Sequence, residues 1–446
     1  MKKLILILTL SISCAFSQHD NRGEKSVFTR NSAPFYADAF FLPVINQDSL
    51  LMPVFFKISN EVLSFSKIEN PQNHVQFKTI PSIEIVLTDT EGIIRKRVHW
   101  EDTIIVDSFE KTISKTDFVT GYTVIKVLND KLRLSVSLNN NEELAINKIL
   151  LDYEKHTDNI LLSKPFFMYE TDINSNKYFK SFILKDGIDF GAKNTSLFFY
   201  DLSPNANNGY NFTLEKITDK NAKLDWKSQI SLSGKFEMIG NAELNILKLL
   251  DKQNYIQLKK NNPDYKYKLY SVSLPVEQMY PGLYRITIHK DNSTDKMIYE
   301  FNIYWREMPL SFSNVDYICE MMFNLLNDKE YDELHSGNDQ KIFNKILEYW
   351  QKKDPTPETA FNEAMNTFFK RVDYALTNFK TFSVRDGAKS DRGKIYILNG
   401  QATTIDKKFE GAKSYEVWRY INIKKEYIFD QISNGVFKLT KINSIE

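Results

Sequence analysis

Hydrophobic and polar positions alternate with a period of two over most of the chain before residue 305. Over 132–138, three leucines and a valine occupy every second position, and an arginine and two serines fall between them. Such alternation is typical of a strand with one buried face. Turn sequences such as Asp-Thr-Glu-Gly at 89–92 and Pro-Gly at 281–282 separate the strands. The pattern predicts antiparallel β-sandwich structure.

The strands fall into two runs, and we predict one β-sandwich-like (Ig-like) module in each run. The first module is expected over 31–158 and the second over 159–306. The clearest piece of the second run is 283–288, which follows the Pro-Gly turn and is expected to pair with 297–305 as a hairpin.

Beyond the second module, apolar residues recur at helical spacing. Amphipathic helices are expected over 315–326 and 342–350. A further helix is expected to begin with Thr356 as its N-cap and Pro357 as its first residue. Its apolar stripe reaches Phe379, which corresponds to a helix of roughly 35 Å.

Period-two alternation returns after this helix, and four strands are expected there, over 394–398, 415–421, 426–430 and 436–441. Asn399-Gly400 is expected to form the turn after the first of them. The sequence therefore predicts a multidomain chain that ends in an α+β domain over 307–446, with helices first and a small antiparallel sheet after them.

The N-terminus has the pattern of an export signal. Two lysines precede a short apolar run, and the sequence Ala-Phe-Ser then fits a cleavage site, so we predict a signal peptide over 1–17 and a mature chain that begins at Gln18. A lipoprotein anchored at Cys14 is the less favoured alternative, because Ser11 stands where a lipidation signal has a leucine-like residue. No later segment reaches about 18 consecutive apolar residues, so no transmembrane span is expected.

Composition narrows the classes of function. The chain has 58 basic and 57 acidic residues, a balance that lacks the basic footprint of a nucleic-acid-binding protein. The six histidines show no metal-ligand spacing, and we expect no metal and no cofactor. The sequence also contains no Gly-x-Ser-x-Gly motif of the kind that serine hydrolases use. Cys319 falls on an apolar helical face and is expected in the core.

Five segments in fixed order carry a resemblance to a known family: 305–309, 349–359, 362–363, 370–375 and 387–400. Together they resemble the GWxTD-domain family of exported Gram-negative envelope proteins, over about 305–446. The naming motif departs here, because Ala388 stands in the place of its tryptophan and Ser390 in the place of its threonine. The resemblance implies architecture and an envelope location, and it implies no established enzymatic activity.

A cluster of polar residues in the C-terminal domain has two interpretations. As a site, its carboxylates could perform acid–base chemistry on a glycan or a peptide. As structure, it would organise a helix start and pin the turn over 387–393 to the long helix, with Asp391 clamped between two arginines. We favour the structural interpretation. The cluster consists of Asp354, Thr356, Asn362, Glu363, Arg371, Asp391 and Arg392.

These observations predict a non-enzymatic protein, exported to the periplasm or the outer membrane and soluble there, that acts in protein–protein assembly or scaffolding with an unidentified envelope protein. The alternative is a carbohydrate- or peptide-directed hydrolase, or a glycan-binding protein, that uses the C-terminal carboxylate and arginine cluster.

Overall fold

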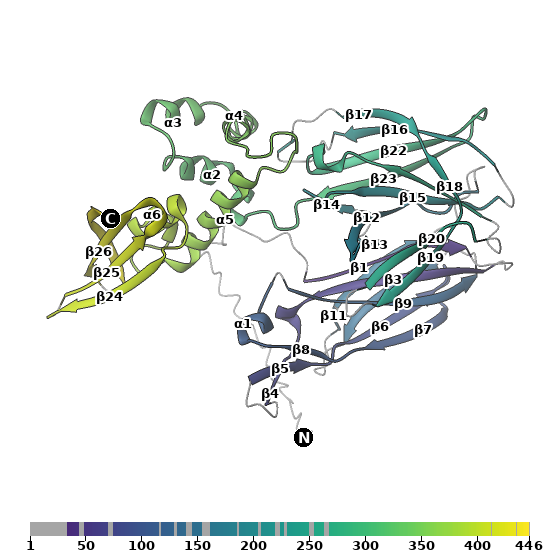
Figure 1. The fold of residues 1–446 in the computed structure, drawn as a ribbon, viewed down its shortest axis with the longest axis horizontal. Coiled ribbons are helices and arrows are strands. Elements are labelled where there is room, and N and C mark those ends of the chain that lie inside the picture. Colours follow the sequence, from purple (N-terminus) through teal and green to yellow (C-terminus); the bar gives the residue numbers. More distant parts are fainter. Residues whose placement is uncertain are drawn as a thin grey trace, which may run out of the picture.

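Figure 1 shows the computed structural model of the chain. It describes residues 34–43, 49–69, 75–115, 117–128, 132–139, 145–153, 161–184, 187–203, 207–218, 224–226, 230–248, 254–262, 267–411, 413–433 and 435–445. The signal peptide expected over 1–17 and its alternative at Cys14 lie outside these residues. In the part of the chain so described, no helix is both long enough and apolar enough to cross a membrane.

The first half of the chain forms two main antiparallel sheets and a small third one. One sheet contains β1 (Phe35–Ala39), β3 (Ser49–Ser59), β2 (Leu42–Pro43) and β9 (Phe118–Leu128). The second has the order β11 (Ala145–Tyr153), β10 (Leu132–Asn139), β6 (Ser82–Thr88) and β7 (Ile94–Glu101). The third joins β4 (Ser66–Glu69), β5 (Val75–Thr79) and β8 (Ile104–Val106), with η1 (Asn60–Val62) and α1 (Phe109–Thr112) beside it. The two main sheets share one apolar core.

Two larger sheets follow. A seven-stranded sheet has the order β18 (Glu237–Asn241), β21 (Lys268–Ser273), β15 (Thr195–Asp201), β12 (Phe166–Ile173), β13 (Asn176–Ser181), β20 (Asn254–Lys259) and β19 (Glu243–Lys248). A five-stranded sheet has the order β14 (Gly187–Asp189), β23 (Lys296–Tyr304), β22 (Gly282–Lys290), β16 (Tyr210–Ile217) and β17 (Ser231–Lys235), and η2 (Val276–Gln278) precedes β22. β22 and β23 form the predicted hairpin.

The sheets are stacked in layers, as Figure 1 shows. β3 belongs to an inner layer: Val54 and Phe56 point into the core of the first half, whereas Phe55 points into a second cluster shared with the seven-stranded sheet. In the same way, Phe198 of β15 joins the shared cluster while Phe199 faces the five-stranded sheet. A strand that is buried on both faces must be apolar at consecutive positions, and this explains the unbroken runs in β3 and β15.

The helices cover one end of this stack. They are η3 (Leu310–Ser313), α2 (Val315–Met322), α3 (Asp328–Leu334), α4 (Asp339–Gln351), α5 (Glu363–Asn378), η4 (Gly387–Lys389) and α6 (Asp391–Asn399). Their apolar faces continue the core of the second pair of sheets without a break. Trp350 is buried in this core, and so is Cys319, as the sequence predicts.

The chain ends in a four-stranded antiparallel sheet, in the order β24 (Thr404–Glu410), β25 (Lys413–Tyr420), β26 (Lys425–Ser433) and β27 (Val436–Ser444), with η5 (Ile421–Ile423) between β25 and β26. Trp418, Tyr420, Tyr427 and Phe429 form the core of this sheet. The β-rich, antiparallel character of the chain and its helix-then-sheet C-terminus are confirmed. The domain boundaries stay predictions.

The strand predicted over 394–398 is wrong, because this segment lies in α6. The hydroxyl of Ser390 caps the helix by accepting a hydrogen bond from the Gly393 amide, at 3.0 Å. Gly400 ends the helix with a φ of 78°, so Asn399-Gly400 is a helix stop and not a hairpin turn. The alternating isoleucines at 395 and 397 suggested a strand, but only Ile397 is fully buried.

The helix start predicted at Thr356 is also wrong. The structure places the N-cap at Asn362, whose Oδ1 accepts a hydrogen bond from the Met365 amide at 2.8 Å. Thr356 instead lies in a turn, where the Asp354 carboxylate accepts hydrogen bonds from its amide and its hydroxyl. α5 therefore has 16 residues and a length of about 24 Å.

Candidate functional site

The polar cluster identified in the sequence is divided in the structure among separate contacts. Asn362 is 6% exposed; besides capping α5, it donates a hydrogen bond from Nδ2 to the carbonyl of Trp350 at 2.7 Å. It thereby ties the start of α5 to the end of α4. Glu363 and Arg371 line an open depression of about 410 Å³ together with Trp350 and Leu398.

Arg371 binds the end of α6 and not Asp391. Its Nη1 donates to the carbonyls of Ile397 and Leu398, at 3.4 and 3.2 Å. Basic side chains stabilise the C-terminus of a helix in this way, because the last carbonyls have no partner within the helix. A Cβ atom on Gly400 would lie 3.0 Å from the Arg371 guanidinium, so this close contact favours glycine there.

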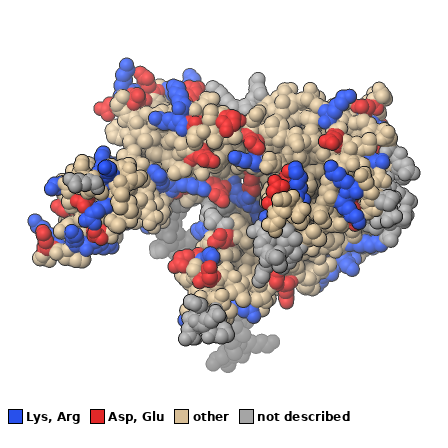
Figure 2. Space-filling view, in the orientation of Figure 1, with Lys and Arg blue, Asp and Glu red and all other residues tan. Residues whose placement is uncertain are grey.

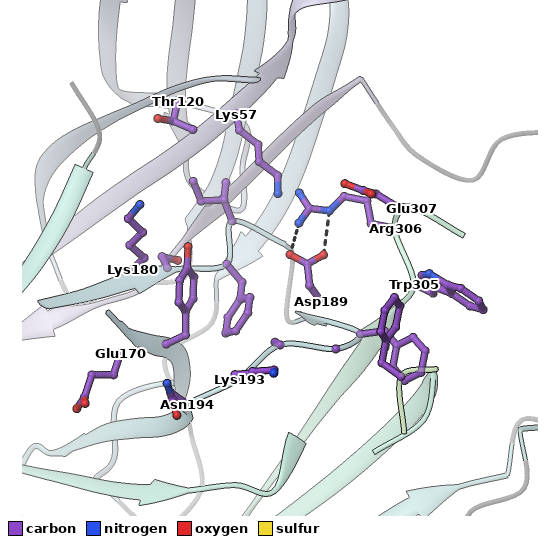
Figure 3. A pocket seen from close by; sticks show the side chains of 18 of the residues that line it. Lys57, Thr120, Glu170, Lys180, Asp189, Lys193, Asn194, Trp305, Arg306 and Glu307 are labelled. Atoms are coloured by element: carbon purple, nitrogen blue, oxygen red, sulfur yellow. Dashed lines mark hydrogen bonds and ion pairs between the residues drawn. The ribbon is translucent and has the colours of Figure 1, made fainter. Parts of the chain in front are cut away.

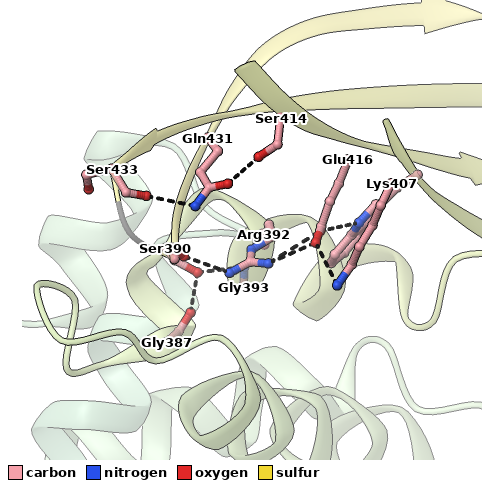
Figure 4. Close-up of polar contacts among 11 residues, drawn as sticks. Gly387, Ser390, Arg392, Gly393, Lys407, Ser414, Glu416, Gln431 and Ser433 are labelled. Atoms are coloured by element: carbon pink, nitrogen blue, oxygen red, sulfur yellow. Dashed lines mark hydrogen bonds and ion pairs between the residues drawn. The ribbon is translucent and has the colours of Figure 1, made fainter. Parts of the chain in front are cut away.

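Asp391 and Arg392 hold the C-terminal sheet against α6, as Figure 4 shows in part. Asp391 Oδ2 accepts a hydrogen bond from the backbone amide of Leu439 in β27, at 2.9 Å. Arg392 Nη1 lies 3.3 Å from the carboxylate of Glu416, and Nη2 donates to the carbonyl of Gly435 at 3.1 Å. Glu416 is only 4% exposed, so this ion pair is buried.

The Arg392 guanidinium also lies between two aromatic rings, 4.2 Å from the centroid of Phe437 and 5.5 Å from that of Phe379. The predicted clamp, with Asp391 between Arg371 and Arg392, is therefore wrong. Because 391 and 392 are consecutive on a helix, their side chains diverge by about 100° and reach different partners. Each of these three side chains makes a contact that supports the fold.

The degenerate motif at 387–391 lies where α5 and α6 meet. Ala388 is 1% exposed. A Cβ atom on Gly387 would lie 2.2 Å from the Ala375 carbonyl, so only glycine lets η4 approach α5 this closely. Asp386 caps η4 by accepting a hydrogen bond from the Ala388 amide at 3.0 Å, and the Tyr317 hydroxyl donates to the same carboxylate at 3.1 Å. Burial raises the pKa of Asp386 above its ordinary value.

A second candidate site is a pocket of about 530 Å³ where the sheet that contains β3 and β9, the seven-stranded sheet, the β14 edge of the five-stranded sheet and α5 meet. We call it the junction pocket; Figure 3 shows it from close by. Lys57 and Thr120 project into it from β3 and β9, on the same face as Phe55. Asn366 and Lys370, one turn apart on α5, line its other side.

An ion pair joins two segments of the pocket wall. β14 and β23 are parallel neighbours, so the residues that follow their carboxyl ends meet at one edge of the sheet. Asp189 and Arg306 therefore face each other across 117 positions of sequence, and the guanidinium binds both carboxylate oxygens through Nε and Nη2. Burial raises the pKa of the Asp189 carboxyl to about 7, and this ion pair favours the charged carboxylate.

Two cations of the pocket lie beside the same pair of aromatic rings. Lys57 Nζ is 5.0 Å from the centroid of Tyr36 and 5.5 Å from that of Phe118. The Arg306 guanidinium is 5.7 and 5.9 Å from the same two centroids. Lys57 is 6% exposed, and it forms no ion pair with any carboxylate of the described residues. The pocket thus holds a buried cation beside an arginine that is already paired.

Two other chemistries find no support within the described segments. No group of three or more histidine, cysteine or acidic side chains is placed to hold a metal ion there. Cys319 is fully buried, and burial raises the pKa of its thiol to about 11, so it is a poor nucleophile.

Two of the segments that carried the family resemblance contribute to the wall of the junction pocket: Trp305, Arg306 and Glu307 come from 305–309, and Lys370 comes from 370–375. The other lining residues come from strands and loops and from Asn366 of α5, and no motif links them. The stacking of the sheets and the packing of α5 bring them together.

Comparison with known families gives one match. The model of the GWxTD domain matches residues 282–441. The match begins at the first residue of β22, so it includes the hairpin of β22 and β23 as well as the helices and most of the C-terminal sheet. No curated protein matches the chain.

Proposed function

Because residues 282–441 form a GWxTD domain, we propose that this protein is an exported, non-enzymatic envelope protein. It assembles with a partner protein through the free edge of its C-terminal sheet. The main support for this proposal is that one edge of β24 is unpaired among the described residues. This strand pairs with β25 on one side, and no strand of the described residues pairs with its other side.

β24 differs from the opposite edge of the same sheet. The amide of Leu439 in β27 is bound by Asp391, so α6 covers part of that edge. β24 instead extends away from the stacked sheets, at the far tip of the molecule in Figure 1. An open edge presents unpaired amides and carbonyls, and an extended segment of another protein can add to it as a further strand.

The side chains of β24 also favour contact with a strand of a partner protein. Ile405 and Phe409 are 47% and 75% exposed and lie on one face of the strand, since they are four positions apart. The strand also carries two lysines and two acidic residues, so its charges balance. A strand with alternating apolar and polar positions and little net charge would complement it.

The described residues on the face that Figure 2 shows give no sign of a polyanionic partner. Figure 2 shows basic and acidic side chains intermingled over the visible face of the described residues. This agrees with the near-equal counts of basic and acidic residues in the whole chain. A protein partner therefore fits better than a nucleic acid.

The test compares two variants of the exported protein in which an exposed apolar side chain is replaced with glutamate. Phe409→Glu adds a charge on β24, whereas Ile298→Glu adds one on β23, where the replaced side chain is 50% exposed. Purification from the envelope should recover the same partner with the wild type and Ile298→Glu, and should lose it with Phe409→Glu. Recovery of that partner at equal yield with Phe409→Glu would exclude β24 as the contact.

N-terminal mass analysis should find Gln18 first in the mature chain; lipid on Cys14 would replace soluble export with anchoring.

A further inference from the structure

We propose that the junction pocket binds an acidic saccharide, whose carboxylate lies between Lys57 and Arg306. This site is separate from β24, and its proposal does not depend on the assembly function. The pocket volume of about 530 Å³ falls within the range of about 300–1,000 Å³ that is usual for small-molecule sites.

The carboxylate position follows from the charges. Lys57 and Arg306 lie against the same two rings, and Asp189 is the carboxylate that binds Arg306. Figure 3 shows the ends of Lys57 and Arg306 pointing toward each other. Arg306 uses Nε and Nη2 for Asp189, which leaves Nη1 to donate to a ligand. A buried cation without a carboxylate partner is costly, and an anion placed between the two groups would offset that cost.

Glu307 acts electrostatically on Arg306, but it forms its ion pair with Lys370, at 2.8 Å, and not with Lys57. Glu170, the remaining acidic side chain of the wall, binds Lys177 at 2.8 Å. Lys193 adds a further positive charge to the lining, with no ion pair to a described residue. The wall therefore carries an excess of positive charge that its own acids do not neutralise.

The rest of the lining suits a sugar ring more than a simple anion. Tyr169 and Phe361 contribute aromatic surface, on which the apolar face of a sugar can pack. Hydroxyl and amide side chains, which can bond sugar hydroxyls, come from Thr120, Ser181, Asn194, Asn254 and Asn366. Two of their atoms, Asn254 Nδ2 and Asn366 Oδ1, are buried without a hydrogen-bond partner. A ligand hydroxyl that reached them would satisfy them.

The most direct test uses two ligands that share their rings and hydroxyls and differ at the two carboxyl groups. Binding of digalacturonate and of its dimethyl ester to the purified full chain is measured by calorimetry. The ester keeps the rings and hydroxyls and removes both negative charges. We expect the acid to bind at least about tenfold more tightly than the ester. Equal affinities, or no binding of the acid, would overturn the proposal.

Variants locate the site. Lys57→Met keeps the apolar stem and removes the charge, and should weaken binding of the acid about tenfold while leaving that of the ester unchanged. Lys259→Gln, on the exposed part of β20 outside the pocket, should change neither affinity. If Lys57→Met does not fold, Lys193→Gln, at an exposed position of the lining, should give a smaller loss in the same direction. Unchanged affinity in the folded lining variant would place the saccharide elsewhere.

A third ligand separates sugar recognition from anion recognition. Adipate carries two carboxylates, as digalacturonate does, but no sugar ring and no positive charge. We expect it to bind at least about tenfold more weakly than digalacturonate. If adipate binds as tightly as the uronate, the pocket recognises carboxylates alone, and the saccharide assignment is wrong.

Discussion

Arg392 connects α6 to the C-terminal sheet through several different contacts. It joins α6 to Glu416 of β25, to the carbonyl of Gly435 and to the rings of Phe379 and Phe437. The sequence identified Arg392 as structural but assigned it the wrong partner. Its true partners are Glu416 of β25 and the carbonyl of Gly435 between β26 and β27, which lie 24 and 43 positions away, and no local pattern reveals that spacing.

The buried pair of Arg392 and Glu416 should contribute strongly to stability. Arg392→Met leaves Glu416 buried, with Lys407 at 3.8 Å as its remaining cation, and should cost about 3–5 kcal/mol of unfolding free energy. The double variant Arg392→Met/Glu416→Gln should cost less than the sum of the two single changes. Denaturant unfolding measures this. Arg285→Met, in an exposed pair with Glu300, is the control and should cost below about 1 kcal/mol.

Asp386 should make stability depend on pH. Burial raises its pKa in the folded protein above the ordinary value of 3.8, so the folded state keeps this proton longer than the unfolded chain does. The free energy of unfolding should therefore fall as pH rises from 3.8 through the folded-state pKa. Asp386→Asn keeps an acceptor for the Ala388 amide and should remove this part of the slope. Urea unfolding of both proteins over a pH series checks it, and equal slopes would contradict the assignment.

At the scale of elements, amphipathic helices and alternating strands were predicted well, because their periods are local properties of the chain. Cap residues were predicted less well. Thr356-Pro357 has the sequence of a helix start. However, Asp354 binds Thr356 in a turn, and the helix begins only after its N-cap, Asn362. In the same way, Asn399-Gly400 fits either a hairpin or a helix stop, and the packing of Ile397 against α5 decides between them.

The two candidate caps can be separated by mutation. Asn362→Ala removes the acceptor for the Met365 amide and the donor to the Trp350 carbonyl, and should cost about 2 kcal/mol. Thr356→Ala keeps the backbone amide that binds Asp354 and should change stability by less than about 0.5 kcal/mol. Chemical denaturation measures both. A larger loss for Thr356→Ala than for Asn362→Ala would favour the helix start expected from the sequence.

At the scale of the molecule, the stacking of the sheets could not be predicted from the sequence. The alternation identifies which strands have a buried face, but it does not say which sheet covers that face. The consecutive apolar residues of β3 and β15 indicate strands that are buried on both faces, but they do not identify the sheets that cover those faces. The same stacking forms the junction pocket, so the position of that pocket could not be predicted from the sequence either.

The stacking predicts that the sheets unfold together. Phe40 and Phe166 stack at 4.3 Å across the contact between the first half and the seven-stranded sheet. Phe166→Ala should cost about 3–5 kcal/mol and split a single thermal transition into two, because it empties volume at this contact. Phe382→Ala, at a fully exposed side chain, should leave the melt unchanged. Two transitions in the wild type would show that the halves unfold independently.

The claim that β24 is the assembly edge is tested most directly by hydrogen exchange in the purified complex. The outward-facing amides of Thr404–Glu410 should exchange rapidly in the free protein and become protected when the partner binds. Amides of the exposed strand β7 should not change, and Phe409→Glu should abolish the protection together with the complex. A stable complex in which β24 exchanges as fast as in the free protein would contradict the account.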